Sequence, residues 1–171
     1  MLAKCYAPYH PPMAIRNIFE LKSLIRPGDR LLGLDVGSKT IGLAIADSTL
    51  TIATPHETIR RTKFAKDAEA LLKVVDGRQV GALVVGLPLN MDGSEGPRCQ
   101  SVRQFATNLL GKRDLEIAFW DERLSTAAVT RTLLDADASR KRRAELVDKM
   151  AAAYILQGAL DMIRRGPVST G

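Results

Sequence analysis

The sequence predicts an α/β fold in which a five-stranded mixed sheet is flanked by helices. Two short, wholly apolar runs at residues 31–34 and 82–85 are typical of strands that are covered on both faces. Residues 41–46 alternate large and small side chains at a period of two, which indicates another strand. Apolar residues recur at helical spacing over 64–75 and 102–109, so helices are expected to separate the later strands.

The order of the elements predicts how the sheet is connected. The strand at 31–34 runs into Asp35 and forms a hairpin with the strand at 41–46, and a third strand at 52–59 contains Pro55, which favours an edge position. The remaining predicted elements are a helix over 64–75, a strand over 82–85, a loop over 86–97, a helix over 102–109, a strand over 115–120, a helix capped by Ser125 and a last helix over 142–164. Three antiparallel strands followed by two right-handed crossovers give a mixed sheet, not a doubly wound nucleotide-binding sheet.

The length and apolar content of the chain fit one domain. A chain of 171 residues with 46% hydrophobic residues can bury a sizeable core. We interpret 30–165 as this domain, 1–29 as an N-terminal extension with a short helix over 14–26, and 166–171 as a C-terminal tail. The longest apolar run, 150–156, is too short to cross a bilayer, and no signal-peptide stretch opens the chain. We therefore expect a cytoplasmic protein with no membrane partner.

Charge and rare residue types limit the chemistry that the chain can perform. The net charge of +6 favours an anionic partner such as nucleic acid. Cys5 and Cys99 lie far apart without a C-x-x-C spacing, which argues against a disulfide framework or a thiolate zinc site. His10 and His56 are the only histidines and offer little material for a Ser-His-Asp site. Catalysis is therefore expected to depend on carboxylates, hydroxyls, Lys or Arg.

Three carboxylates stand where a protein core would not place them. Asp35 ends the first buried strand, Glu122 follows the fifth, and Asp148 lies on the apolar stripe of the last helix. Carboxylates at the ends of two strands, facing a third on a packed helix, suit a hard divalent cation such as Mg²⁺ or Mn²⁺. Such an ion can activate water against a phosphodiester. The alternative interpretations of Asp148 are an ion pair with a nearby Arg or Lys, or an acid near the helix start that favours the helix dipole.

The loop over 86–97 is long and rich in glycine, which favours a role in substrate handling. Glu95 in this loop is a candidate further metal ligand, with simple solvation as the alternative. Residues 33–40 differ by one position from a phosphate-binding loop, because Ser38 stands where that motif requires glycine. The strand that follows them instead predicts a tight turn that brings Lys39 near substrate phosphate.

Basic residues are the candidates for binding nucleic acid. Besides Lys39 and Arg123, the sequence contains a run of four at Arg140, Lys141, Arg142 and Arg143, where the last helix begins. Cations at a helix start oppose the helix dipole, which suggests a use for them. Phosphate contacts are that use, and a solvated helix face is the alternative.

Four segments in order, 32–44, 84–88, 120–126 and 147–152, resemble the YqgF family of Holliday-junction-resolvase-like proteins, also called RuvX. The resemblance implies a ribonuclease H-like fold and a nuclease that matures the 5′ end of pre-16S ribosomal RNA, with branched DNA as the other family substrate. The family's acids correspond to Asp35, to Glu122 in an Asp-Glu-Arg motif, and to Asp148. Resolvase relatives carry a glutamate just after the fourth strand, where this chain has Gly86-Leu87-Pro88. This departure argues against resolvase activity and assigns the glutamate role to Glu122.

These observations favour a Mg²⁺- or Mn²⁺-dependent endonuclease acting on pre-ribosomal RNA, as a monomer or homodimer. A resolvase of branched DNA remains an alternative. A sugar-kinase or actin-like ATPase shares the Asp-x-Gly hairpin, but it needs two such domains and a second phosphate motif. A non-catalytic RNA-binding factor in ribosome assembly is the third alternative, and it would tolerate the loss of Glu122.

Overall fold

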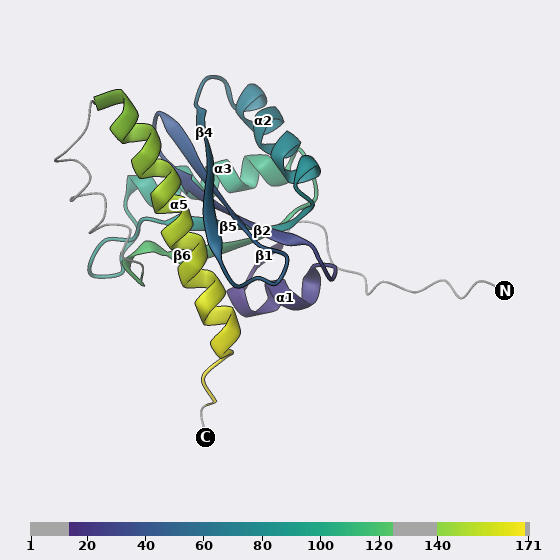
Figure 1. Ribbon diagram of the computed structural model, residues 1–171. Coiled ribbons are helices and arrows are strands. Elements are labelled where there is room, and N and C mark those ends of the chain that lie inside the picture. Colours follow the sequence, from purple (N-terminus) through teal and green to yellow (C-terminus); the bar gives the residue numbers. More distant parts are fainter. Residues whose placement is uncertain (1–13, 125–139, 170–171) are drawn as a thin grey trace.

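The computed structural model describes residues 14–124 and 140–169, with the side chains of 15–124 and 148–169. The strands are β1 (Ala14–Arg16), β2 (Arg30–Val36), β3 (Thr40–Ala46), β4 (Ala53–Arg60), β5 (Val80–Leu87) and β6 (Glu116–Asp121). The helices are α2 (Phe64–Gly77), α3 (Pro97–Leu110) and α5 (Arg140–Arg165), with the one-turn α1 (Leu21–Leu24) and 3-10 turns at Ile18–Glu20 and Glu122–Leu124. Figure 1 shows α5 crossing one face of the sheet while α2 and α3 lie on the other.

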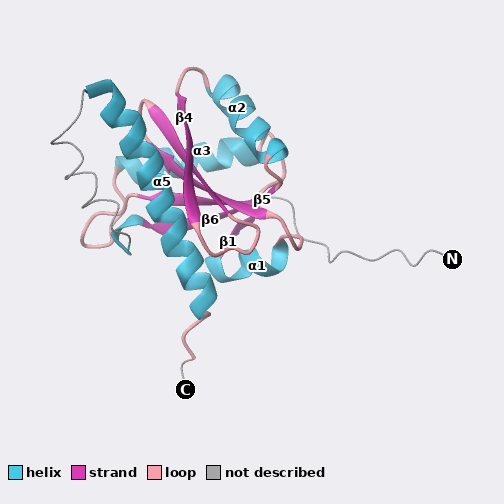
Figure 2. Ribbon diagram, viewed as in Figure 1, coloured by secondary structure: helices cyan, strands magenta, loops and turns pink. Residues whose placement is uncertain are grey.

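The six strands are ordered β1-β6-β5-β2-β3-β4. β2, β3 and β4 are antiparallel neighbours, whereas β2, β5, β6 and β1 run parallel to one another. Figure 2 shows this single twisted sheet between its helices. The hairpin, the two crossovers and the edge position of the strand that contains Pro55 are confirmed, as is the ribonuclease H-like fold.

The predicted number of five strands is wrong, because β1 adds a sixth strand beside β6. The helix predicted over 14–26 is also wrong in its first half: residues 14–16 form β1, and a capping box between Asn17 and Glu20 starts only two short turns. β1 pairs in parallel with the outer edge of β6, where unpaired backbone groups are available. A part-buried ion pair between Arg16 and Glu116, 2.8 Å apart, fixes the strand there.

Each face of the sheet carries its own apolar core. The face toward α2 and α3 is filled by large side chains such as Leu34, Leu71 and Phe105. The face toward α5 carries small residues, including Ala44 and Ala46, which pack against Ile155 and Leu156 of the helix. Small side chains let the backbone of α5 approach the strands closely. No helix in the described part of the chain is long and apolar enough to cross a membrane.

Candidate active site

Asp35 lies near the carboxyl end of β2 and is buried, with 3% of its surface exposed. Its register partner on β3 is Gly42. Directly paired residues of antiparallel strands point to the same face of a sheet. The Asp35 side chain therefore points to the same face of the sheet as a side chain at position 42 would, and α5 covers that face.

Asp148 is brought to this place by the close contact of α5 with β3. A Cβ atom at Gly42 would lie 3.0 Å from the Cβ of Asp148 and would overlap the carbonyl group of the same residue. The helix backbone thus rests directly on the strand at the residue paired with Asp35. The hydroxyl of Thr40 donates a hydrogen bond to Oδ2 of Asp148, which orients the carboxylate toward the β2–β3 hairpin.

Glu122 approaches Asp35 from the opposite side. It follows β6 directly and is buried, with 9% of its surface exposed. A Cβ atom at Gly86 of β5 would lie 2.7 Å from Oε1 of Glu122, so the carboxylate occupies the space above this glycine. Because Val85 pairs with Leu34, Gly86 is level with Asp35 on the adjacent strand. A glutamate at position 86 would occupy the space that the side chain of Glu122 fills.

The three predicted acids therefore share one edge of the sheet, on the face toward α5. Hard divalent cations prefer oxygen ligands, and the carboxylate oxygens of these partly buried acids meet that preference. Among the residues that the structure describes, no group of three His, Cys, Asp or Glu side chains is arranged to hold a metal ion as it stands. The donor chemistry fits Mg²⁺ or Mn²⁺, while the structure does not present a preformed cage.

Arg123, predicted to bind nucleic acid, is held by other groups of the protein. Its Nε lies 3.0 Å from both carboxylate oxygens of Asp121, and its Nη2 lies 2.7 Å from Oδ2. These hydrogen bonds lower the pKa of Asp121 and raise that of Arg123. Nη1 of Arg123 also donates to the carbonyl oxygen of Met91 at 3.2 Å. Arg123 thus ties the loop between β5 and α3 to the end of β6.

The other candidate residues are placed as follows. Lys39 is exposed on the β2–β3 turn, one residue before the hydroxyl that contacts Asp148, and the turn leads into a strand as predicted. Glu95 forms a bidentate ion pair with Arg103, and the hydrogen bonds from Arg103 lower the pKa of Glu95. Glu95 is therefore engaged by Arg103 and is not grouped with the three acids. The residues of the run 140–143 form the first turn of α5, but their side chains, like the helix expected after Ser125, lie outside the described residues.

Two features of the site were missed in the sequence. Thr40 orients Asp148, and Arg60 is the register partner of Thr40 on β4, which places it on the same face. Neither residue belongs to a recognisable spacing, because their neighbourhood depends on pairing between strands. The glycines at 42 and 86 were readable only as flat or flexible positions.

A ribonuclease H-like sheet with carboxylates at the ends of neighbouring strands and on the packed helix defines a nuclease of that fold class. A sequence model of the family described as "RuvX: Holliday junction resolvase" matches residues 29–162, and the chain belongs to this family. The predicted family resemblance is therefore confirmed, which favours the nuclease interpretation over the ATPase one.

Relatives of this chain agree with this assignment. A protein of Paramagnetospirillum magneticum named "Putative pre-16S rRNA nuclease" is 71% identical over 142 residues, which cover 83% of this chain and 92% of the relative. A protein of the same name from Rhodospirillum centenum is 60% identical over 164 residues, covering 93% and 87%. A structure of T. thermophilus RuvC in complex with Holliday junction substrate has a TM-score of 0.47 at 14% identity, covering 74% of this chain and 91% of that one.

Proposed function

We propose that this protein is a metal-dependent, cytoplasmic nuclease that processes the 5′ end of pre-16S ribosomal RNA. The observation that carries the proposal is the position of Asp35, Glu122 and Asp148 on one edge and one face of the sheet. The names of the relatives supply the substrate, because they share 60% to 71% of their residues with this chain. The net charge of +6 suits a polyanionic substrate.

The proposed chemistry assigns a task to each group around the acids. Asp35, Glu122 and Asp148 would hold one or two Mg²⁺ or Mn²⁺ ions, which when bound supply an activated water and stabilise charge on the phosphate. Thr40 fixes the orientation of Asp148 through its hydrogen bond. The missing side chain at Gly86 leaves room for the carboxylate of Glu122 beside Asp35. Burial of Asp35 keeps bulk water from its carboxylate.

The test is cleavage of a pre-16S leader RNA by Asp35→Asn, Glu122→Gln and Asp148→Asn in the presence of Mg²⁺. Each variant is expected to lose cleavage, because an amide cannot replace an anionic ligand of a hard cation. Asp114→Asn provides a matched control at an exposed position away from the three acids. Circular dichroism and thermal unfolding report whether each variant is folded. Unchanged cleavage by a folded Asp35→Asn variant would remove the residue from the mechanism.

Branched DNA is the second candidate substrate, and the printed description of the family supports it. Parallel assays on four-way junction DNA and on the leader RNA, with Mg²⁺ and with Mn²⁺, separate the two. Cleavage confined to the junction would reverse the order of the two substrates. RNA binding that survives in Glu122→Gln while the wild type shows no cleavage under any condition would instead support a non-catalytic role in ribosome assembly.

A further inference from the structure

We propose that the nucleic acid reaches the acids across one particular side of the molecule, which we call the β4–α2 surface. It consists of Lys39, Arg60, Lys63, Lys66, Lys73 and Arg78. The ligand is the phosphate backbone of a single-stranded nucleic acid. This inference rests on the proposed function and adds to it the path that the substrate takes.

The β4–α2 surface begins at the candidate active site. Thr40, which donates to Asp148, is paired with Arg60 at the end of β4, so the Arg60 side chain lies on the face of the sheet that carries the acids. The next residue, Arg61, connects the two segments: its backbone N–H donates to the carbonyl oxygen of Lys39 at 2.8 Å. Its guanidinium donates to the carbonyl oxygen of Gly37 at 2.7 Å. The β2–β3 turn and the β4–α2 connection are therefore held together as one surface.

The lysines of this surface are available to a ligand. Lys39, Lys63 and Lys66 are exposed, and none of them forms an ion pair with any residue that the structure describes. Many other cations of the protein are neutralised by a carboxylate within 4.0 Å, namely Arg16, Arg103, Arg113, Arg123 and Arg164. Asp67, the acid nearest in sequence to Lys63 and Lys66, is buried and accepts hydrogen bonds from the backbone N–H and the hydroxyl of Thr62. The exposed part of this connection is thus positive.

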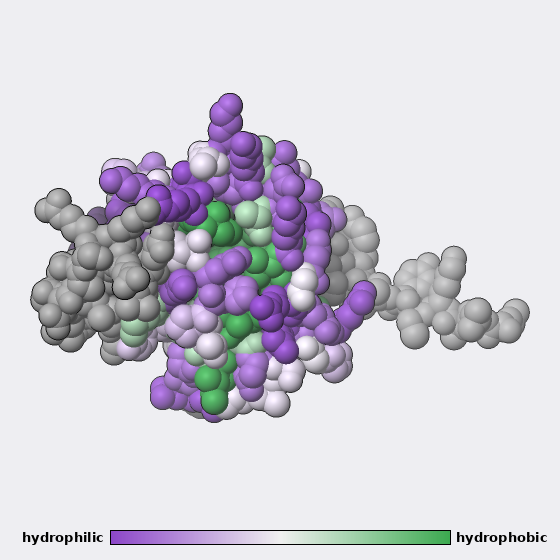
Figure 3. Space-filling model, turned by 45° about the horizontal axis from the view of Figure 1, so that its top comes forward, coloured by the Kyte–Doolittle hydropathy of each residue, from purple (hydrophilic) through white to green (hydrophobic). Residues whose placement is uncertain are grey.

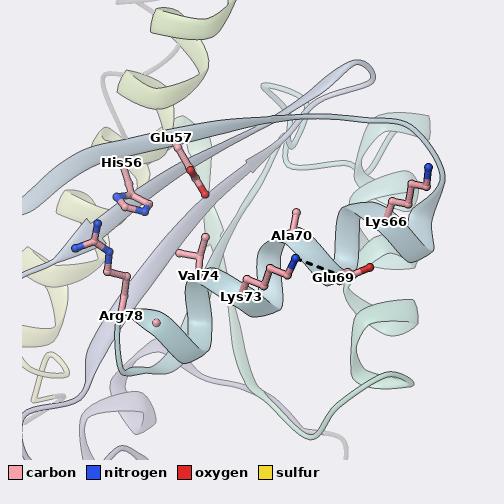
Figure 4. A pocket seen from close by; sticks show the side chains of 9 residues that line it. His56, Glu57, Lys66, Glu69, Ala70, Lys73, Val74 and Arg78 are labelled. Carbon is pink, nitrogen blue, oxygen red and sulfur yellow. Dashed lines mark ion pairs between the residues drawn. The ribbon is translucent and has the colours of Figure 1, made fainter.

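A groove continues the surface around the edge strand β4, onto the face of the sheet that α2 covers. It has a volume of about 670 Å³ and lies between β4, which contributes His56 and Glu57, and α2. Figure 4 shows Lys66, Lys73 and Arg78 following one another along α2 beside this groove. Hydrophilic side chains cover much of this end of the molecule in Figure 3.

The spacing of these cations indicates the shape of the ligand. At 1.5 Å per helical residue, Lys66 and Lys73 are about 10 Å apart along the axis of α2, and Arg78 follows just past the end of the helix. A row of separated charges suits an extended polyanion better than a compact anion, which requires donors that converge. The only ion pair in the groove, between Lys73 and Glu69, spans 3.6 Å and is largely exposed, so a phosphate can compete for Lys73 at small cost.

The experiment compares two charge-matched double variants, Lys63→Gln/Lys66→Gln on the surface and Lys22→Gln/Lys112→Gln elsewhere. All four lysines are exposed, and each pair removes the same charge. Binding of fluorescent leader RNA and of four-way junction DNA is measured by anisotropy over a range of salt concentrations, with EDTA to prevent cleavage. Each lost contact to a single strand should flatten the log–log salt dependence by about 0.7, so the surface variant is expected to lose about 1.4 units of slope.

The control variant is expected to keep the wild-type slope. An unchanged slope in the surface variant, or equal changes in both variants, would overturn the proposal. Because binding is measured without metal or cleavage, a failure of the nuclease assay leaves this result interpretable, and the two hypotheses fail separately. A change seen with junction DNA but not with RNA would refute the single-stranded path.

Discussion

Replacing Gly42 by alanine tests whether the contact between α5 and β3 holds the acids together. The added Cβ would lie 3.0 Å from the Cβ of Asp148 and would overlap the carbonyl group of that residue. That Cβ would lie 2.4 Å from the carbonyl carbon of Asp148, and carbon atoms in contact need about 3.5 to 4.0 Å, so the helix must retreat by about 1 to 1.5 Å. The obstructing atoms belong to a helix backbone and cannot rotate away.

The magnitude follows from this forced movement. Overpacking of this kind costs about 1 to 3 kcal/mol, partly offset by about 0.5 to 1 kcal/mol that alanine gains over glycine in a strand. We expect a net loss of about 1 kcal/mol in the free energy of unfolding. Because Asp148 moves away from Asp35 with the helix, cleavage should fall about 100-fold, the usual effect of a misplacement near 1 Å.

Urea unfolding and cleavage of the leader RNA measure the two effects. Gly77→Ala is the matched control, because its Cβ would meet nothing within 4 Å at the end of α2, and it should be as stable as the wild type or slightly more so. Gly86→Ala provides the opposite pattern: the atoms nearest to its Cβ would be side-chain atoms of Ile155 and Glu122, so stability should fall little while cleavage falls. Wild-type stability and activity in Gly42→Ala would refute the reasoning.

Three further predictions concern other parts of the molecule. The pKa of Asp47 is lowered to about 2, first by the hydroxyl of Thr49 and then by backbone N–H groups. Its carboxylate therefore stabilises the fold above pH 4, and this contribution disappears as the pH falls through about 2. Urea unfolding should show Asp47→Asn to be less stable than the wild type at pH 5 but equal to it near pH 2. Arg123→Ala should make the loop at 88–96 more sensitive to limited proteolysis with little change in urea unfolding, because the lost ion pair is screened by solvent. Undiminished resistance to the protease would show that the loop is held by other contacts. Arg142→Gln/Arg143→Gln should bind RNA more weakly, with a shallower salt dependence and a nearly unchanged thermal midpoint; an unchanged slope would identify the basic run as a solvated face.

The fold was largely readable because most of its elements carry their own periodicity. The apolar runs at 31–34 and 82–85 indicate buried strands without reference to any other residue. β1 was missed because three residues are too few to show alternation, and its strand conformation depends on the free edge of β6. The same residues read in isolation favour the helical pattern that continues through Leu21 and Leu24.

The candidate site was readable only in part. Asp35 and Glu122 stood out as acids directly after buried strands, and Asp148 as an acid on an apolar stripe, as the structure places them. Which residues surround these acids depends on strand register and on how closely α5 approaches the sheet. The partnership of Thr40 with Asp148 spans 108 positions, and no local pattern encodes it.

The length of α5 places Asp148 inside the helix and not at its end. Its 26 residues extend over about 39 Å, and residues 151–160 are embedded in the core while the helix begins about 12 Å beyond Asp148. The helix backbone at Asp148 rests on Gly42 of β3. Asp148 therefore lies where the helix backbone contacts β3, between the first two turns of α5 and the segment that is embedded in the core.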